Sequence, residues 1–226
     1  FLFPAVIPLY RGEYLKFDDD GLRGEIYKSD RFYLDFSVDF NLAVDSSDVE
    51  ERLGMPDLDN IIQLGPSLEW MLKNDDNDQW LLKLGLRAAI AVDGVDLNST
   101  GFTANPQLTW YRKFEAGQRD WRLGVTGGLL FGTENYHDFY YQVSPEFVTA
   151  QRAQYDASGG YGGFRGITTL VSRNEKSWIA LFARYENYSG AINKGSDLLP
   201  SSDGLTFGFV YSRFLFRSKT LVNAER

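Results

Sequence analysis

Apolar and polar residues alternate along most of this chain with a period of two. In the interval 31–42, RFYLDFSVDFNL, apolar residues take every even position, and Asp35, Ser37 and Asp39 are among the residues between them. Successive side chains of a β-strand point to opposite faces of its sheet, so this pattern predicts a strand with one apolar face. Similar alternation predicts strands at 60–73, 79–93, 102–115, 121–132, 159–172, 177–189 and 204–216.

The predicted strands are long for a soluble sheet. Each runs about 12–15 residues, whereas strands of soluble sheets commonly have about 5–6. A strand that crosses a membrane needs about 9–11 residues in the hydrocarbon, with extensions into both interfaces. Short links at 74–78, 116–120 and 173–176 also alternate with longer ones at 43–59, 94–101, 133–158 and 190–203. Outer-membrane barrels join their strands in this way, so we expect an all-β, antiparallel transmembrane β-barrel that spans 1–226 as one domain.

The number of strands depends on how the first forty or so residues fold. If 22–42 is one long bent strand and one strand precedes Phe1, the barrel has about ten strands. If 22–29 and 31–42 are separate strands, it has about twelve. We favour about ten, with an N-terminal strand outside this sequence. Pro66 and Pro106 lie inside predicted strands and have no N–H to donate, so each predicts a β-bulge. A C-terminal tail follows at 217–226.

Composition narrows the classes of function. The net charge of −8 disfavours nucleic acid as a partner, because contacts to phosphates need a basic face. The chain has no Cys and one His, which excludes Cys-based and His-rich metal sites, and we expect no metal and no cofactor. No apolar run reaches the roughly 18–20 residues of a transmembrane helix. The chain begins at Phe1 without a signal-peptide pattern, as it would after removal of a signal peptide or if only part of the protein were present.

Charged residues on the polar faces are the candidates for a lumen. If the apolar faces meet lipid, the polar faces line the inside, where charges need partners because an isolated buried charge is very unfavourable. A barrel of about ten strands is narrow, and side chains can fill much of it. We therefore favour a salt-bridged, filled interior over a small polar pore. The candidate lumen residues are Asp39, Glu69, Arg87, Arg122, Arg165, Arg184 and Glu186.

The interval 133–158 interrupts the alternation and contains the only histidine. His137 lies among aromatic residues, and a glycine cluster at 159–163 follows. Strand parity places this interval in a long outer loop, and we expect it to fold as a lid over or into the barrel mouth. Glycines at 159–163 would let the strand bend or let aromatic rings pack close to the wall. The lid residues are Tyr136, His137, Tyr140, Tyr141, Arg152 and Tyr155.

His137 is also the one candidate catalytic base. Ser144 or Ser158 could act as its nucleophile, but a triad is defined by geometry, and no G-x-S-x-G motif is present. We favour a histidine that forms hydrogen bonds within its tyrosine-rich loop, and we expect no catalytic residues. Acidic pairs at 18–20 and 75–76 match solvated turns, and the acidic residues at 45–59 fit no calcium-loop spacing.

Several longer stretches resemble the MipA/OmpV family of Gram-negative outer-membrane proteins, and the resemblance covers nearly the whole chain. It is carried by PAVIPLYRG (4–12), DGLRG (20–24), LGPSLEW (64–70), LKLGLRAAIAVD (82–93) and NPQLTWYRKF (105–114). Its most specific part is YHDFYYQVSPEF (136–147), AQRAQYDASGGYGG (150–163) and FARYENYSGA (182–191). The chain departs from the family at Ala153, where Pro is frequent, and in its tail past Phe216.

The resemblance implies a barrel in the outer membrane, in contact with membrane lipid and lipopolysaccharide. The family's namesake is a scaffold that joins the lytic transglycosylase MltA to a bifunctional penicillin-binding protein in peptidoglycan synthesis. The resemblance thus implies a non-enzymatic scaffold for periplasmic peptidoglycan-remodelling enzymes, although no motif of this chain maps to that binding. Other members are tied to antibiotic uptake and adhesion, so the alternative is a small polar channel or small-molecule entry site. A lipid-modifying enzyme and a soluble β-sandwich binding module are further alternatives.

Overall fold

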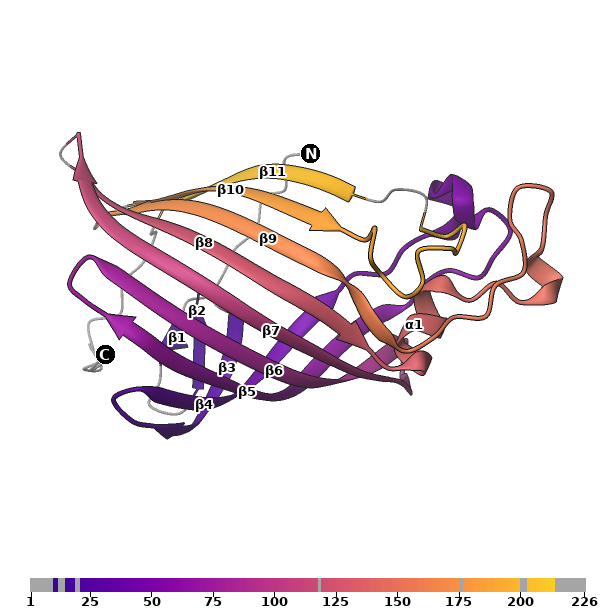
Figure 1. Ribbon diagram of the computed structural model, residues 1–226, viewed down its shortest axis with the longest axis horizontal. Helices are drawn as coiled ribbons and strands as arrows, with labels where there is room; N and C mark the ends of the chain where they lie inside the picture. The colour runs from indigo at the N-terminus through magenta and orange to yellow at the C-terminus, as the bar shows by residue number, and fades with distance from the viewer. Residues whose placement is uncertain are drawn as a thin grey trace.

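The protein folds as one antiparallel sheet that curves into a barrel-shaped wall (Figure 1). The computed structural model describes residues 10–11, 15–18, 21–117, 119–174, 177–199 and 203–213. Eleven strands in this part of the chain each pair with their neighbours in sequence, which confirms the expected all-β antiparallel barrel. They are β1 (Tyr10–Arg11), β2 (Leu15–Asp18), β3 (Gly21–Lys28), β4 (Phe32–Asn41), β5 (Asn60–Asn74), β6 (Asp78–Asp93), β7 (Asp96–Ala116), β8 (Arg119–Gly132), β9 (Gly160–Arg173), β10 (Ser177–Asn187) and β11 (Asp203–Arg213).

The two faces of the sheet are inverted relative to a water-soluble protein. Phe36, Leu84 and Phe209 are 40%, 41% and 66% exposed, whereas the polar residues Asp35 and Ser67 are 6% and 0% exposed. Residues paired directly across an antiparallel register share a face, so the buried polar sets of neighbouring strands join into one inner surface. An apolar outside around a polar inside is the arrangement of barrels that sit in lipid.

The two ends of the barrel carry different links. Short turns join β3 to β4, β5 to β6 and β7 to β8 at one end. The other end carries three long segments: 42–59 with the 3-10 helices η1 (Ser46–Asp48) and η2 (Glu50–Arg52), 133–159 with α1 (Glu134–Tyr141) and η3 (Pro145–Phe147), and 188–199 after β10 (Figure 1). None of the described helices is both long and apolar enough to cross a membrane.

The expected long link at 94–101 is wrong. Gly94 and Val95 form a tight turn, and β7 already begins at Asp96. Gly94 has φ +57°, a left-handed conformation that glycine adopts without steric strain. The polar segment 96–99 then pairs with the end of β6, from Asp93↔Asp96 to Ile90↔Ser99. A polar composition suggested a loop here, but the backbone pairing of a hairpin does not depend on apolar side chains.

Two details of the strands differ from what the sequence suggests. β3 and β4 are separate strands, so the prediction of one long bent strand over 22–42 is wrong. Separate strands in this interval correspond to the alternative of about twelve strands. The bulges expected at Pro66 and Pro106 are also absent from the described strands. Pairing lapses there on one side and resumes in the same register, from Leu64↔Ala88 to Ser67↔Gly85 in the first case. Proline removes one donor, which interrupts the ladder without adding a residue to it.

Three expectations concern parts of the chain that the structure does not describe or that the sequence does not contain. The tail at 217–226 lies outside the described residues. So does the end of the last predicted strand beyond Arg213. The expected strand before Phe1 precedes the sequence itself.

Candidate functional site

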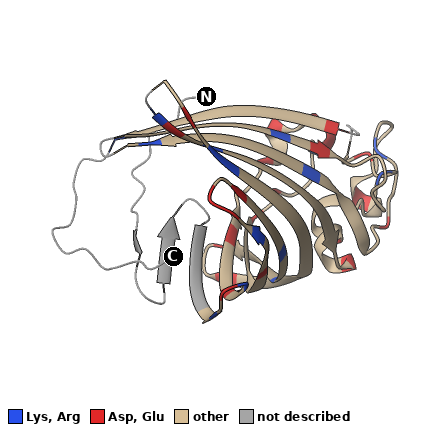
Figure 2. Ribbon diagram, turned by 60° about the vertical axis from the view of Figure 1, so that its left-hand side comes forward, with Lys and Arg blue, Asp and Glu red and all other residues tan. Residues whose placement is uncertain are grey.

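Ion pairs connect several charged residues on the inner surface of the barrel. Lys83 Nζ lies 2.8 Å from Glu69 Oε1, and the two side chains are 19% and 13% exposed. Arg165 contacts Glu186 Oε1 through Nη2 at 2.7 Å, and Arg184 Nε lies 3.6 Å from Glu186 Oε2. Charged positions, blue and red in Figure 2, lie along the strands as well as in the loops. The structure therefore brings Arg165, Arg184 and Glu186 together, and gives Glu69 a partner that was not among the candidates.

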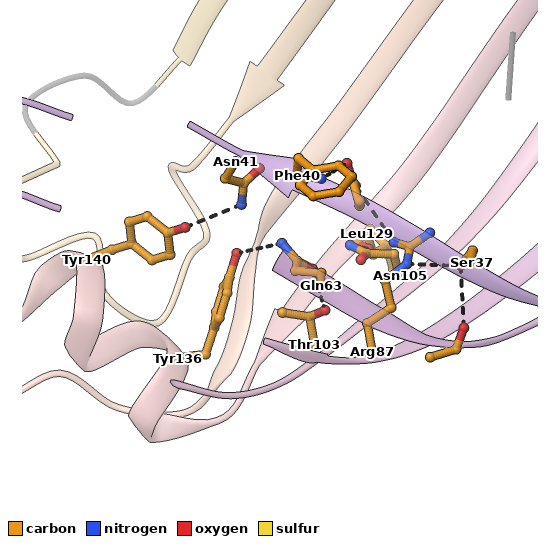
Figure 3. Close-up of polar contacts among 12 residues, drawn as sticks. Ser37, Phe40, Asn41, Gln63, Arg87, Thr103, Asn105, Leu129, Tyr136 and Tyr140 are labelled. Carbon is orange, nitrogen blue, oxygen red and sulfur yellow. Dashed lines mark hydrogen bonds and ion pairs between the residues drawn. The ribbon is translucent and has the colours of Figure 1, made fainter. Parts of the chain in front are cut away.

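The other candidate lumen residues lie in two separate places. Arg87 Nε donates a hydrogen bond to Ser37 Oγ (3.1 Å; Figure 3). Its Nη1 lies 4.0 Å from Asp39 Oδ2. Arg122 lies toward the short-turn end, where its guanidinium stacks 4.7 Å above the ring of Tyr111. A positive charge over an aromatic face is attracted to the negative potential of the ring. Most of these inner charges are therefore held by a partner within the wall.

Helix α1 packs against the inner surface of the wall at the long-loop end. Tyr136, Phe139 and Tyr140 contact the buried cluster of Ile61, Ala89 and Ala91. The small alanine side chains leave room for the rings close to the strands. An isolated helix of eight residues is unstable in water, so this packing, rather than helix propensity, holds α1 in place.

Hydrogen bonds fix the tyrosines of α1 to the strands. Gln63 Nε2 donates to the Tyr136 hydroxyl (3.4 Å), and Gln63 Oε1 accepts from Thr103 Oγ1 (2.9 Å). Asn41 Nδ2 donates to the Tyr140 hydroxyl (3.3 Å), as Figure 3 shows. Burial raises the pKa of Tyr136 and of Tyr140 above the ordinary value. Both hydroxyls therefore stay protonated and neutral while their oxygens accept these hydrogen bonds.

His137 lies against two paired strands, β8 and β9. It is 2% exposed, and its Nδ1 lies 2.7 Å from the carbonyl oxygen of Ser158. A carbonyl accepts hydrogen bonds, so Nδ1 carries the proton and Nε2 does not in the neutral ring. A Cβ at Gly132 would lie 2.7 Å from Nε2, and one at Gly162 would lie 3.2 Å from it. The glycines thus let the ring lie against the wall.

Two buried arginines hold the long segments at this end together. Arg152 is 6% exposed and donates to the carbonyl oxygens of Phe147 (2.8 Å), Glu51 (2.8 Å) and Leu53 (3.2 Å). Arg52 donates to the carbonyl oxygen of Tyr140 (3.3 Å) at the end of α1, and burial followed by the nearby charge of Arg152 lowers its pKa. Each arginine thus joins segment 42–59 to segment 133–159.

Segment 188–199 is joined to the same unit. Asn193 donates through Nδ2 to the Ser158 carbonyl (2.9 Å) and accepts from the Ser158 N–H through Oδ1 (2.9 Å). Ser196 Oγ donates to the Tyr141 carbonyl (2.8 Å), and Asp197 Oδ2 accepts from the Ala153 N–H (2.8 Å). We call the three connected segments, 42–59, 133–159 and 188–199, the loop cap.

A cavity of about 330 Å³, here called the mouth cavity, lies between α1 and the inner wall. The strands contribute Asp39, Asn41, Gln63, Asn105 and Arg165 to it, and the loop cap contributes tyrosines and His137. Of the expected lid residues, Tyr136, His137, Tyr140 and Tyr141 line the cavity. Arg152 and Tyr155 instead lie among the contacts that hold the loop cap together.

Several residues of this site were not singled out from the sequence. Asn41 and Gln63 lie at inward positions of cleanly alternating strands, so strand parity could have identified them. Arg52 and Asn193 lie in polar loops and carry no such signal. Their partners are 88 and 35 residues away in the chain, and only the folded structure brings them into contact.

Among the described residues, no three acidic or histidine side chains gather as a metal site would require. Asp45 instead caps η1, and Asp57 accepts from the Ser46 N–H.

The comparisons with known proteins identify a family. Residues 1–214 match the family model described as MltA-interacting protein MipA. Comparison with curated proteins and with solved structures gave no match. The match covers nearly the whole chain and includes every described strand, in agreement with the resemblance of the sequence motifs. The chain belongs to the MipA family of Gram-negative outer-membrane proteins.

Proposed function

We propose that this protein is a non-enzymatic barrel of the outer membrane that anchors a lytic transglycosylase of the MltA type on its periplasmic side. The family match over 1–214 is the observation that carries this proposal, since the family is named for that interaction. The exposed apolar outer face supports the membrane location, because it would need to be covered by lipid acyl chains and the fatty acids of lipopolysaccharide. A penicillin-binding protein held beside the transglycosylase would complete the scaffold.

The environment of His137 supports the absence of catalysis. Nδ1 is engaged by a backbone carbonyl, and Nε2 faces the backbones at Gly132 and Gly162. A general base needs a free nitrogen within hydrogen-bond reach of a nucleophile. Among the described residues, His137 contacts Ser158 through its carbonyl oxygen and not through its hydroxyl. We therefore propose that His137 positions α1.

The short-turn end is the surface that we propose for the transglycosylase. Short turns of outer-membrane barrels face the periplasm, and longer loops face outward. The turn between β5 and β6 is acidic, with Asp75 paired to Lys73 at 2.8 Å and Asp76 exposed next to it. Such turns present charges without apolar cover, which suits a reversible contact between folded proteins.

A capture experiment tests the proposal. The full chain, purified from the outer membrane in detergent, is immobilised and offered a purified transglycosylase of the MltA type. We expect capture by the unaltered chain and weaker capture by Asp76→Lys. Glu50→Lys, the same charge change in the loop cap, should capture as well as the unaltered chain. Recovery of the protein as a detergent-free soluble monomer, or equal capture by both variants, would contradict the proposal.

A small polar entry site is the second candidate, and the mouth cavity favours it because it opens among polar side chains at one end of the barrel. The pairing of most inner charges argues against an open pore, because a filled interior requires such pairs. Planar-bilayer recordings separate the two. An open pore gives steady conductance that changes in Arg87→Ala or Arg184→Ala, whereas a filled barrel gives none in either variant.

A further inference from the structure

We propose that the mouth cavity binds a carbohydrate of one or two sugar rings that carries no acidic group. The cavity volume of about 330 Å³ is close to the lower end of small-ligand pockets, which span about 300–1,000 Å³. The site lies at the loop-cap end, and so it is independent of the transglycosylase surface proposed for the short turns.

Side-chain amides supply the polar part of the recognition. Asn41 uses one N–H for the Tyr140 hydroxyl, and Asn105 Nδ2 lies 3.5 Å from the Leu129 carbonyl. Within the described part of the chain, the side-chain oxygens of Asn41 and Asn105 accept no hydrogen bond, although both residues line the cavity. Each amide can donate and accept in one plane. Neighbouring hydroxyl groups on a sugar ring also donate and accept, so they match this pattern.

Aromatic rings supply the apolar part. Tyr136, Tyr140, Tyr141, Tyr188 and Phe131 line the cavity. The rings of Tyr136 and Tyr140 meet edge to face with their centroids 5.2 Å apart, and the bonds to Gln63 and Asn41 fix them further. A pyranose has one face made of C–H groups, and a preformed aromatic surface buries such a face at little cost in side-chain entropy.

The charges around the cavity disfavour an acidic ligand. Asp39, Asp59 and Arg165 line it; Arg165 is already held by Glu186 at 2.7 Å, and Asp39 lies 4.0 Å from Arg87. Asp59 therefore remains as a carboxylate of the lining with no ion-pair partner among the described residues. An anion placed there would be repelled and would lose its hydration without a partner. A neutral sugar meets neither penalty, and an amino sugar would be attracted by Asp59.

A matched series of sugars tests the inference. Glucose, glucosamine and glucuronate share one ring and differ in charge. The full chain in detergent micelles is titrated with each sugar, and binding is followed by saturation-transfer NMR. We expect saturable binding of glucose and glucosamine, and about tenfold weaker binding of glucuronate because its carboxylate meets Asp59. Asp59→Asn should remove any preference for glucosamine over glucose.

A variant in the wall ties binding to the cavity. Asn105→Leu removes the amide and should weaken glucose binding by about tenfold or more, since a sugar hydroxyl is left unpaired. Gln151→Ala, an exposed loop-cap change outside the cavity, should bind normally. Heat-modifiable migration in detergent gels reports whether each variant is folded. If Asn105→Leu does not fold, Asn41→Asp replaces it and should show a larger preference for glucosamine over glucose than the unaltered chain does. Three results would overturn the inference: no saturable binding, binding of glucuronate as tight as that of glucose, or normal binding by folded Asn105→Leu. None of them would affect the result of the transglycosylase capture experiment.

Discussion

Replacing Arg152 by Ala should release segment 42–59 from segment 133–159 while the barrel itself stays folded. The guanidinium is almost fully buried and donates to three backbone carbonyl oxygens, two of which belong to the other segment. Alanine reaches none of them. The free energy of opening the loop cap should therefore fall, whereas the strand ladders do not depend on this side chain.

The size of the effect follows from the three hydrogen bonds. Hydrogen bonds from a charged donor contribute about 1.5–3 kcal/mol each. Three bonds at the lower value give about 4.5 kcal/mol. The change also removes the desolvation of Arg152 and its repulsion of Arg52, which offsets part of the loss. We expect opening to become easier by about 3 kcal/mol, which is roughly a hundredfold in the opening equilibrium.

Amide hydrogen exchange of the folded protein in micelles measures how far segment 42–59 loosens once it is released. The reporters are the N–H groups of Val44 and Leu58, which bond to each other's carbonyl oxygens at 2.9 Å near the two ends of this segment. Their exchange should accelerate about a hundredfold in Arg152→Ala, and the neighbouring exposed change Gln151→Ala should leave it unaltered. Unchanged exchange in Arg152→Ala, or equal acceleration in the central strands, would refute the reasoning.

Three other predictions concern the packing of His137, the buried phenols and the inner ion pairs. Gly132→Ala places a methyl group against His137 and should destabilise the packing of α1 by about 1–3 kcal/mol. Proteolysis of the loop cap should become faster. An unaltered rate of proteolysis would contradict the role of Gly132 in making room for His137. Burial raises the pKa of Tyr136 above the value of about 10 that it has in the unfolded chain. The protonated phenol therefore contributes fully to stability below about pH 10, and this contribution is lost as the pH rises further. Phenolate absorbance should show that some tyrosines ionise only when the protein unfolds. Lys83→Met leaves Glu69 without its partner and should lower the free energy of unfolding by about 1–3 kcal/mol. Adding Glu69→Gln to the same chain should restore most of this loss. Chemical denaturation measures both changes.

The strands and their two faces could be predicted from the sequence because both follow from local alternation. Strand β5 was expected at 60–73 and is found at Asn60–Asn74, with Gln63 and Ser67 inside as their parity required. The segment at 96–99 was missed because its polar residues carry no alternation, although its backbone pairs fully with β6. Hydrogen bonds between main-chain groups do not depend on side-chain polarity, so the polarity pattern cannot predict them.

The loop cap could be predicted only in part. The tyrosine-rich composition around His137 indicated a folded lid, and the structure has α1 packed on the inner wall there. The contacts that hold the cap together, from Arg52, Arg152 and Asn193, join residues far apart in the chain. No periodicity encodes which carbonyl a buried arginine will reach, because that depends on how three loops fold against one another.

The central claim, that the apolar face meets lipid and the polar face lines the barrel, can be tested at neighbouring residues. The sequence has no cysteine, so single spin labels can be placed at Leu84→Cys and Leu108→Cys outside, and at Gly85→Cys and Thr109→Cys inside. In outer-membrane vesicles we expect labels at 84 and 108 to collide strongly with oxygen dissolved in lipid, and labels at 85 and 109 to collide weakly. Equal oxygen collision at all four positions, or stronger collision of 84 and 108 with a water-soluble relaxation agent, would contradict the account.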